Sequence, residues 1–232
     1  MSDPQDRLRL RDFTLAPRGS GFGLRTVNFD LEAGDICTLE ADAADDAHLF
    51  LRALATLETP LAGTFDFNGQ RLDFSDYRHL LAAKRRIGYI AADSALLSNR
   101  SIRENLLYAR FFFENSLELE LTEAVVDLCR RFHLKDKLQW LPDELNAVEK
   151  RVAVTIRELA AAPDLILFES PEEHLGQAHL DTFLEIIAPL RQGPTAMVFS
   201  CESLHCIDSI ANRQLRLEGG QLVELTGSEP PR

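Results

Sequence analysis

The sequence predicts an α/β protein with a mainly parallel central sheet, a smaller antiparallel β part and an inserted group of helices. Short segments of alternating hydrophobic and polar residues fill the first third of the chain. Helical patterns then follow one another from about residue 101 to residue 160, and two strongly hydrophobic strands flank a later helix. Strand, helix and strand in this order form the usual unit of a parallel sheet. At 232 residues the chain can bury one large core, so we expect a single domain over residues 1–232.

The opening elements are strands and one helix. Residues 8–15 and 24–31 alternate between hydrophobic and polar side chains, which predicts two antiparallel strands. A short turn leads into residues 35–39, whose hydrophobic run predicts a buried strand. Residues 49–57 carry hydrophobic side chains at helical spacing. A further short strand over residues 63–69 ends in an Asn-Gly turn.

The later elements are helices in the middle of the chain and strands near its end. The predicted helices cover about residues 77–84, 101–113, 122–132, 146–162, 180–191 and 203–211. The predicted strands cover residues 87–90, 165–168 and 195–200 and a final hairpin of residues 214–217 and 221–225. We therefore expect a core from about residues 8–92 and 161–225 and a helical subdomain from about residues 93–160.

Composition excludes several classes of protein. The formal net charge of −12 argues against binding to a nucleic-acid backbone, which requires a basic face. No apolar run reaches membrane-spanning length, and the first residues lack the apolar core of a signal peptide, so we expect a cytoplasmic protein. The four cysteines form no CxxC pair, which favours reduced thiols; they are Cys37, Cys129, Cys201 and Cys206.

The turn between the strand at residues 35–39 and the helix that follows lies where a phosphate-binding Walker A loop would lie. That loop reads GxxxxGK[ST]; its backbone N–H groups cradle phosphate, its lysine reaches the terminal oxygens, and its hydroxyl binds Mg²⁺. The corresponding key positions here are Ala41, Asp46, Ala47 and His48. Both glycines, the lysine and the hydroxyl are replaced.

Four carboxylates occupy the same turn: Glu40, Asp42, Asp45 and Asp46. Two like charges about 4 Å apart repel by roughly 4 kcal/mol at an effective dielectric constant near 20, so we expect this loop to repel ATP. We also expect Asp45 or Asp46 to act as the N-cap of the helix, where a carboxylate is favourable. An alternative is a divalent metal site formed by Asp42, Asp45, Asp46 and His48.

The order of elements and several local sequences resemble the ATPase domain of ABC transporters along nearly the whole chain. The matching segments are Pro60 and Gly63, Arg86–Ile90, Ile102–Leu106 and Ala162–Phe168. The resemblance implies a P-loop NTPase fold with a RecA-like parallel sheet core, an antiparallel β subdomain and an α-helical insert.

Because of the resemblance, each motif of the family can be assigned to residues of this chain, and each replacement can be identified. Ala92 stands where the Q-loop glutamine is expected, and Cys201 where the switch histidine is expected. The Walker B strand ends in Glu169 and Ser170 instead of Asp-Glu, and Ser170 cannot act as a general base at neutral pH. In place of the LSGGQ signature the chain has Asn146, which could still cap the helix, followed by Ala147, Val148 and Glu149.

These replacements lead us to expect a catalytically inactive protein, a pseudo-ATPase that serves as a structural or regulatory subunit of an ABC transporter-like complex. ATP and Mg²⁺ are expected to bind weakly or not at all. The expected partners are a membrane permease subunit and an active ABC ATPase subunit, with the chain held at the inner face of the membrane through the permease. Two alternatives are a soluble regulatory module without a permease and an ABC transporter ATPase with non-standard nucleotide binding.

Three consecutive phenylalanines mark a candidate docking site for the permease. Phe111, Phe112 and Phe113 lie about 100° apart on a predicted helix and cannot all face one core. We expect two of them to pack in the core and the third to be exposed or bound to a partner.

Overall fold

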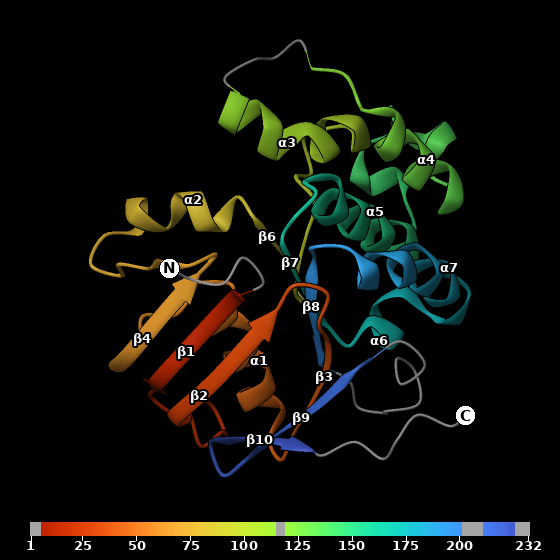
Figure 1. Cartoon of the computed structure of the whole chain (residues 1–232). Coiled ribbons are helices and arrows are strands. Elements are labelled where there is room, and N and C mark those ends of the chain that lie inside the picture. Colours follow the sequence, from red (N-terminus) through yellow and green to blue (C-terminus); the bar gives the residue numbers. More distant parts are fainter. Residues whose placement is uncertain (1–5, 115–118, 201–210, 226–232) are drawn as a thin grey trace.

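The computed structural model describes residues 6–114, 119–200 and 211–225, which form two sheets with helices between and around them (Figure 1). The strands are β1 (Asp6–Leu15), β2 (Leu24–Glu32), β3 (Ile36–Ala41), β4 (Ala62–Phe67), β5 (Gln70–Arg71), β6 (Ile87–Ile90), β7 (Leu165–Glu169), β8 (Ala196–Ser200), β9 (Arg213–Glu218) and β10 (Gln221–Leu225). The α-helices are α1 (Ala44–Leu54), α2 (Leu81–Lys84), α3 (Ile102–Glu114), α4 (Glu123–Arg131), α5 (Ala147–Ala160), α6 (Pro171–Leu175) and α7 (Gln177–Ile187). Short 3-10 helices cover Tyr77–Leu80, Lys135–Lys137, Pro142–Glu144 and Ala188–Gln192.

One sheet is antiparallel and has the strand order β2-β1-β4-β5. Strands β1 and β2 pair as their alternating patterns predict, with Leu10 opposite Phe29 and Phe13 opposite Val27. The turn between β4 and β5 is the expected Asn-Gly sequence, and both Asn68 and Gly69 have positive φ. This turn chemistry is typical of a tight hairpin.

The other sheet has the strand order β10-β9-β3-β8-β7-β6. Strands β9, β3, β8, β7 and β6 run parallel, and β10 pairs antiparallel with β9 at the edge. Strands β3, β8 and β7 are hydrophobic because both faces of this part of the sheet are covered. Every residue of β7 is buried.

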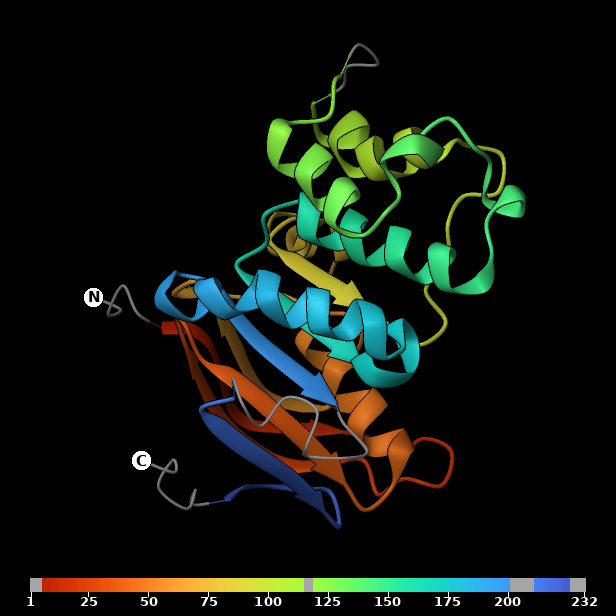
Figure 2. The same ribbon diagram turned by 90° about the vertical axis from the view of Figure 1, so that its right-hand side faces the viewer.

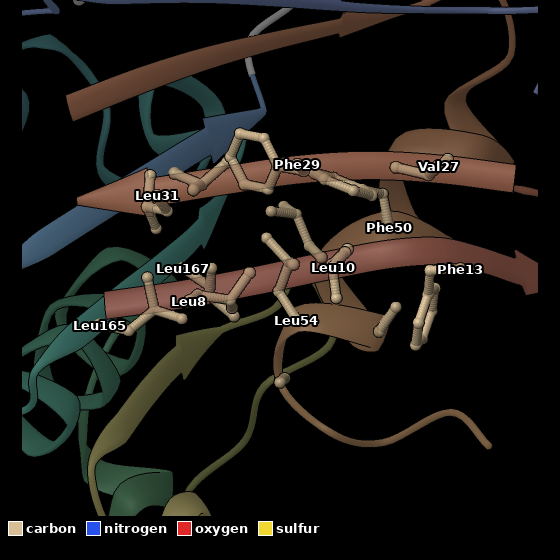
Figure 3. Close-up of a cluster of buried hydrophobic side chains, with 14 of the residues drawn as sticks. Leu8, Leu10, Phe13, Val27, Phe29, Leu31, Phe50, Leu54, Leu165 and Leu167 are labelled. Atoms are coloured by element: carbon tan, nitrogen blue, oxygen red, sulfur yellow. The ribbon is translucent and has the colours of Figure 1, made fainter. Parts of the chain in front are cut away.

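Two hydrophobic clusters lie on opposite faces of this second sheet. In the first, α1 lies between the two sheets, and Phe50 and Leu54 of this helix contact the inward-facing side chains of β1 and β2 (Figure 3). Leu165 and Leu167 of β7 complete that cluster. The alternate residues of the same strand, including Phe168, belong to the second cluster, which is covered by helices. The period of two along a strand thus assigns neighbouring residues to different clusters.

Helices α3, α4 and α5 gather at one end of the molecule, away from the antiparallel sheet (Figures 1 and 2). The predicted elements up to residue 200 and the final hairpin are confirmed, with ends shifted by a few residues. The helix predicted at 203–211 falls almost wholly outside the described residues. No helix in the described part of the chain is both long and apolar enough to cross a bilayer.

Two cysteines in the described residues are free and buried, as the reduced-thiol prediction requires, and Cys201 and Cys206 lie outside that part. Burial raises the pKa of the Cys129 thiol to about 11, and it raises the pKa of the Cys37 thiol further. Thiols react as thiolates, so we expect neither cysteine to be alkylated in the folded protein at pH 8.

The experiment uses a variant with Cys201→Ser and Cys206→Ser, treated with iodoacetamide and analysed by intact mass. We expect no adduct in buffer and two adducts in denaturant. Rapid double labelling of the folded protein would contradict the burial described here.

Candidate functional site

A cavity of about 600 Å³ opens at the carboxyl ends of β3, β7 and β8, next to the start of α1. This edge of a parallel sheet is where open α/β folds bind their ligands. The residues that line the cavity come from four strands, from α1 and from the segments that follow β6 and β7; they are Leu39, Glu40, Ala41, Ala44, Asp45, Ala47, His48, Ala92, Glu169, Ser170, Ser200 and Arg216.

Only two residues separate β3 from α1. Strand β3 ends at Ala41 and the helix starts at Ala44. Its N-cap residue, Ala43, provides no side-chain hydrogen bond. The predicted cap by Asp45 or Asp46 is therefore wrong. The N–H groups of Asp46 and Ala47 donate to the Ala43 carbonyl, whereas those of Ala44 and Asp45 precede the first intrahelical hydrogen bond, and both of these residues line the cavity.

Asp45 and Asp46 bind the loop of residues 16–23 instead of capping the helix. Asp46 is 2% exposed, and its carboxylate accepts hydrogen bonds from the backbone N–H groups of Phe22 at 3.0 Å and Gly23 at 2.9 Å. Asp45 accepts hydrogen bonds from the N–H group of Ser20 at 2.7 Å and from its hydroxyl at 2.8 Å. We call these contacts between Asp45, Asp46 and residues 20–23 the acidic clasp.

Glycine at two loop positions permits the acidic clasp. A Cβ atom on Gly21 would lie 2.3 Å from Asp46 Oδ1, and one on Gly19 would lie 2.4 Å from Asp45 Oδ2. Such distances are far below van der Waals contact, so a larger residue would displace the carboxylates. The loop is also held at Arg18, which pairs with the buried Glu58 at 2.6 Å.

The acidic turn therefore does not aim four carboxylates at a common point. Asp45 and Asp46 are occupied by the clasp, and Asp42 Oδ1 accepts a hydrogen bond from Arg216 at 3.2 Å. The hydrogen bonds from the Ser20 backbone and side chain hold the pKa of Asp45 below its ordinary value. The expectation of four unpaired carboxylates that face a ligand is therefore wrong, because three of the four have hydrogen-bond partners.

Glu169, at the end of β7, joins three parts of the cavity wall. Its Oε1 lies 2.7 Å from His48 Nδ1 and accepts a hydrogen bond from the Tyr89 hydroxyl, and its Oε2 accepts a bond from the Ala92 N–H at 2.9 Å. Burial, followed by the hydrogen bond to Glu169, raises the pKa of Tyr89. The structure thus brings together the predicted positions His48, Ala92 and Glu169.

The other predicted site positions divide into two groups. Ala41, Ala47 and Ser170 line the cavity, and Ser170 has a φ of +43° immediately before α6. The residues at the start of α5 do not line it. Asn146 caps that helix as predicted and forms a capping box with Glu149.

The remainder of the start of α5 is exposed, and one predicted residue cannot be placed. Ala147 and Val148 lie in the first turn of α5, where Val148 is 38% exposed. Cys201 lies outside the described residues. Among the residues that the structure describes, no group of three His, Cys, Asp or Glu side chains could hold a metal ion, so the alternative metal site at Asp42, Asp45, Asp46 and His48 is not formed.

Sequence reasoning missed Arg216, Tyr89 and Ser20 as site residues. Arg216 reaches the cavity from β9, which pairs parallel with β3 and places Arg216 opposite Glu40. The hairpin of β9 and β10 was predictable from the sequence, but its position beside β3 was not. The hydroxyl of Ser20 carries no motif that would mark it.

Comparison with known proteins identifies transporter subunits as relatives. No family model matches the chain. The lipoprotein-releasing system ATP-binding protein LolD 2 of Chlorobium chlorochromatii is 28% identical over 94% of this chain and 93% of that protein. The arginine transport ATP-binding protein ArtM of Bacillus subtilis is 23% identical over 87% of this chain and 83% of its own length.

Solved structures agree with these relatives at the level of the fold. The dimeric ATP-binding cassette MJ0796, in a post-hydrolysis state bound to ADP and Pi, superposes with a TM-score of 0.79 at 16% identity and covers 95% of this chain and 100% of that chain. The ATP-binding subunit of an ABC transporter gives a TM-score of 0.78 at 19% identity, covering 95% and 90% of the two chains. The chain therefore has the ABC ATPase fold, as the resemblance implied.

These comparisons correct the predicted function. The named relatives are ATP-binding proteins of transport systems, and one neighbour holds ADP and phosphate. The prediction of a catalytically inactive scaffold or regulator is contradicted by them, and so is the prediction that ATP and Mg²⁺ do not bind. The expectation was based on the number of replaced motif residues. The sequence does not show that Asp45 and Asp46, two acidic residues of this loop, bind residues 20–23.

Proposed function

We propose that this protein is the ATP-binding subunit of an ABC-type transporter and that it holds its nucleotide in a non-standard way. The observation that carries the proposal is the cavity at the start of α1, which combines an uncapped helix N-terminus with a guanidinium group, Arg216. A helix N-terminus favours phosphate through its free N–H groups and its dipole. The expected nucleotide is ATP, because the named relatives are ATP-binding proteins.

Several groups of the cavity suit the phosphates and the metal of Mg-ATP, and the Glu40 and Asp45 carboxylates line it beside them. The N–H groups of Ala44 and Asp45 and the Arg216 side chain are donors suited to phosphate oxygens. Glu169 supplies the carboxylate oxygen that Mg²⁺ prefers as a ligand. When bound, Mg-ATP supplies the phosphoanhydride bond on which ABC-type systems act. The departures from the family's Walker A, Q-loop, Walker B and signature residues are the reason that we propose a non-standard pose.

Replacing Ala44 by proline tests the role of the helix N-terminus with little cost to the fold. Proline removes one N–H group at the first position of a helix, where it is otherwise well tolerated. Ala43 already has φ −124° and ψ 128°, the extended conformation that a residue before proline prefers. We expect Ala44→Pro to weaken Mg-ATP binding by about tenfold in titration calorimetry, the usual worth of one hydrogen bond to a charged group.

The matched control is Glu123→Pro, the same substitution at the first position of α4, outside the cavity. It should leave Mg-ATP binding unchanged. Absence of binding heat from the natural chain would overturn the proposed function. Binding that is equally strong in the Ala44→Pro variant would show that nucleotide lies elsewhere.

The proposed transporter also requires contact with a membrane permease, and α3 presents a suitable surface. Phe112 is 67% exposed and packs edge-to-face on Phe113, which is 37% exposed. Phe111 is partly buried, and none of the three belongs to either hydrophobic cluster, so the expectation that two of them pack in the core is wrong. A groove of about 480 Å³ runs beside Phe113 and is lined by Tyr108, Leu96 and Leu97 among others. Aromatic groups of this kind are typical interface anchors.

We propose that this groove and Phe111 to Phe113 receive the permease, so that the chain lies at the inner face of the membrane and pairs there with a second ATP-binding subunit. Replacing both Phe112 and Phe113 by serine should abolish co-purification with the permease subunit of the same transporter in detergent. The control is Tyr77→Ser, which removes a side chain that is 68% exposed elsewhere. Unchanged co-purification of the correctly folded double variant would refute the docking role.

A further inference from the structure

Among the described residues, one arginine lines the proposed nucleotide cavity, and it lies on β9, a strand that the sequence did not place at the site. Among the described residues that line the cavity, Arg216 is the single Lys or Arg. His48 also lines it, but its Nδ1 is engaged by Glu169. The position that carries lysine in a Walker A loop is occupied by Ala47, whose methyl group has no charge to offer.

The position of Arg216 follows from the strand pairing. Strand β9 is the parallel neighbour of β3, and Arg216 lies opposite Glu40 in that register, one residue before the end of β3. Paired residues of neighbouring strands project to the same face of a sheet. Arg216 is therefore fixed by the backbone of the sheet, whereas the lysine of a Walker A loop belongs to the loop and helix.

The guanidinium group of Arg216 retains hydrogen-bonding capacity. One terminal nitrogen donates to Asp42 Oδ1 at 3.2 Å, which is long for a charge-assisted bond. Its Nε is buried and lies 2.9 Å from Glu218 Oε1, without the alignment of a hydrogen bond. The side chain as a whole is 42% exposed, so an anion in the cavity can reach it.

We infer that Arg216 replaces the missing lysine as the cation that binds the phosphate chain of the nucleotide, and that Asp42 competes with phosphate for it. This inference rests on the proposed function. A guanidinium group suits phosphate because its planar donors can form two parallel hydrogen bonds. Asp42 then acts as a weak internal anion that holds Arg216 over the cavity before nucleotide enters.

The inference predicts opposite effects of two substitutions on equilibrium binding. Arg216→Ala should weaken Mg-ATP binding by about tenfold to a hundredfold, the usual worth of a charge-assisted hydrogen bond. Arg216→Lys should restore part of that loss. Asp42→Asn should tighten binding by up to about fivefold, because it releases Arg216 from a partly exposed ion pair. The tightening by Asp42→Asn should largely disappear in the Arg216→Ala background.

The experiment is titration calorimetry of the full chain with two probes, Mg-ATP and inorganic tripolyphosphate. Arg216→Ala should weaken the binding of both probes by a similar factor, because the inferred contact is with the phosphate chain. The matched control is Arg71→Ala, which removes the same charge from an exposed ion pair with Asp66 on the antiparallel sheet. It should leave binding unchanged.

The outcomes separate this inference from the proposed function. If the natural chain binds Mg-ATP and Arg216→Ala binds it equally well, the inference is overturned and the function stands. A loss for Mg-ATP without a loss for tripolyphosphate would also overturn it. If the natural chain binds neither probe, the proposed function itself fails and the inference falls with it. An Arg216→Ala variant that does not fold leaves the effect of Asp42→Asn as the deciding measurement, and no tightening there would overturn the inference.

Discussion

Replacement of Asp46 by alanine is expected to lower the free energy of unfolding by about 3 kcal/mol, because it leaves one buried and one partly buried backbone N–H group without an acceptor. These are the N–H groups of Phe22 and Gly23, which Asp46 binds at 3.0 and 2.9 Å. The carboxylate is 2% exposed, so water cannot replace it without opening the loop. Urea unfolding monitored by circular dichroism measures the change.

Two further variants show whether the acidic clasp is the cause. Asp45→Ala removes the neighbouring carboxylate, whose partner Ser20 is exposed, and should have a much smaller effect. Gly21→Ala should destabilise the natural protein, since the added Cβ atom would lie 2.3 Å from Asp46 Oδ1. In the Asp46→Ala background, the same Gly21→Ala change should cost far less. Additive effects of the two substitutions would contradict the described contact.

Replacement of Glu169 by alanine is expected to lower the free energy of unfolding by about 2 to 3 kcal/mol and to release the segment after β6. Glu169 accepts hydrogen bonds from Tyr89 and from the Ala92 N–H group, and it also pairs with His48. The Glu169 carboxylate thus connects β7 with β6 and α1. Its removal leaves the Tyr89 hydroxyl, the Ala92 N–H group and the His48 ring without their shared partner.

Hydrogen exchange gives this second prediction a local readout. The Ala92 N–H group should lose protection in the Glu169→Ala variant, while the N–H groups in the centre of β8 keep theirs. The control is Tyr89→Phe, which removes one donor and keeps the carboxylate; it should cost about 1 kcal/mol and leave Ala92 protected. Equal protection of Ala92 in the natural protein and in Glu169→Ala would refute the role of Glu169 as the connecting residue.

The individual helices and strands were largely predictable because their signals are local. The alternation in β1 and β2, the hydrophobic run of β7 and the Asn-Gly turn after β4 each follow from a few neighbouring residues. The two sheets and their strand order depend on pairings between distant segments. The resemblance to a known family supplied the type of fold, and periodicity alone would not have done so.

The candidate site was predictable in its position but not in its chemistry. The cavity lies where the sequence places it, beside Ala41, Ala47 and His48. The directions of Asp45 and Asp46 depend on a loop that lies more than twenty residues earlier in the chain, and no local pattern records that approach. A charge count in sequence therefore misjudged how many of these carboxylates are unpaired.

The division of β7 between two hydrophobic clusters affects how the chain can change in length. Leu165 and Leu167 face α1, whereas Ile166 and Phe168 face the helices on the other side. Insertion of one residue within β7 would exchange these two sets and disturb both clusters at once. It would also turn Glu169 away from the cavity. We therefore expect insertions and deletions to be excluded from this strand.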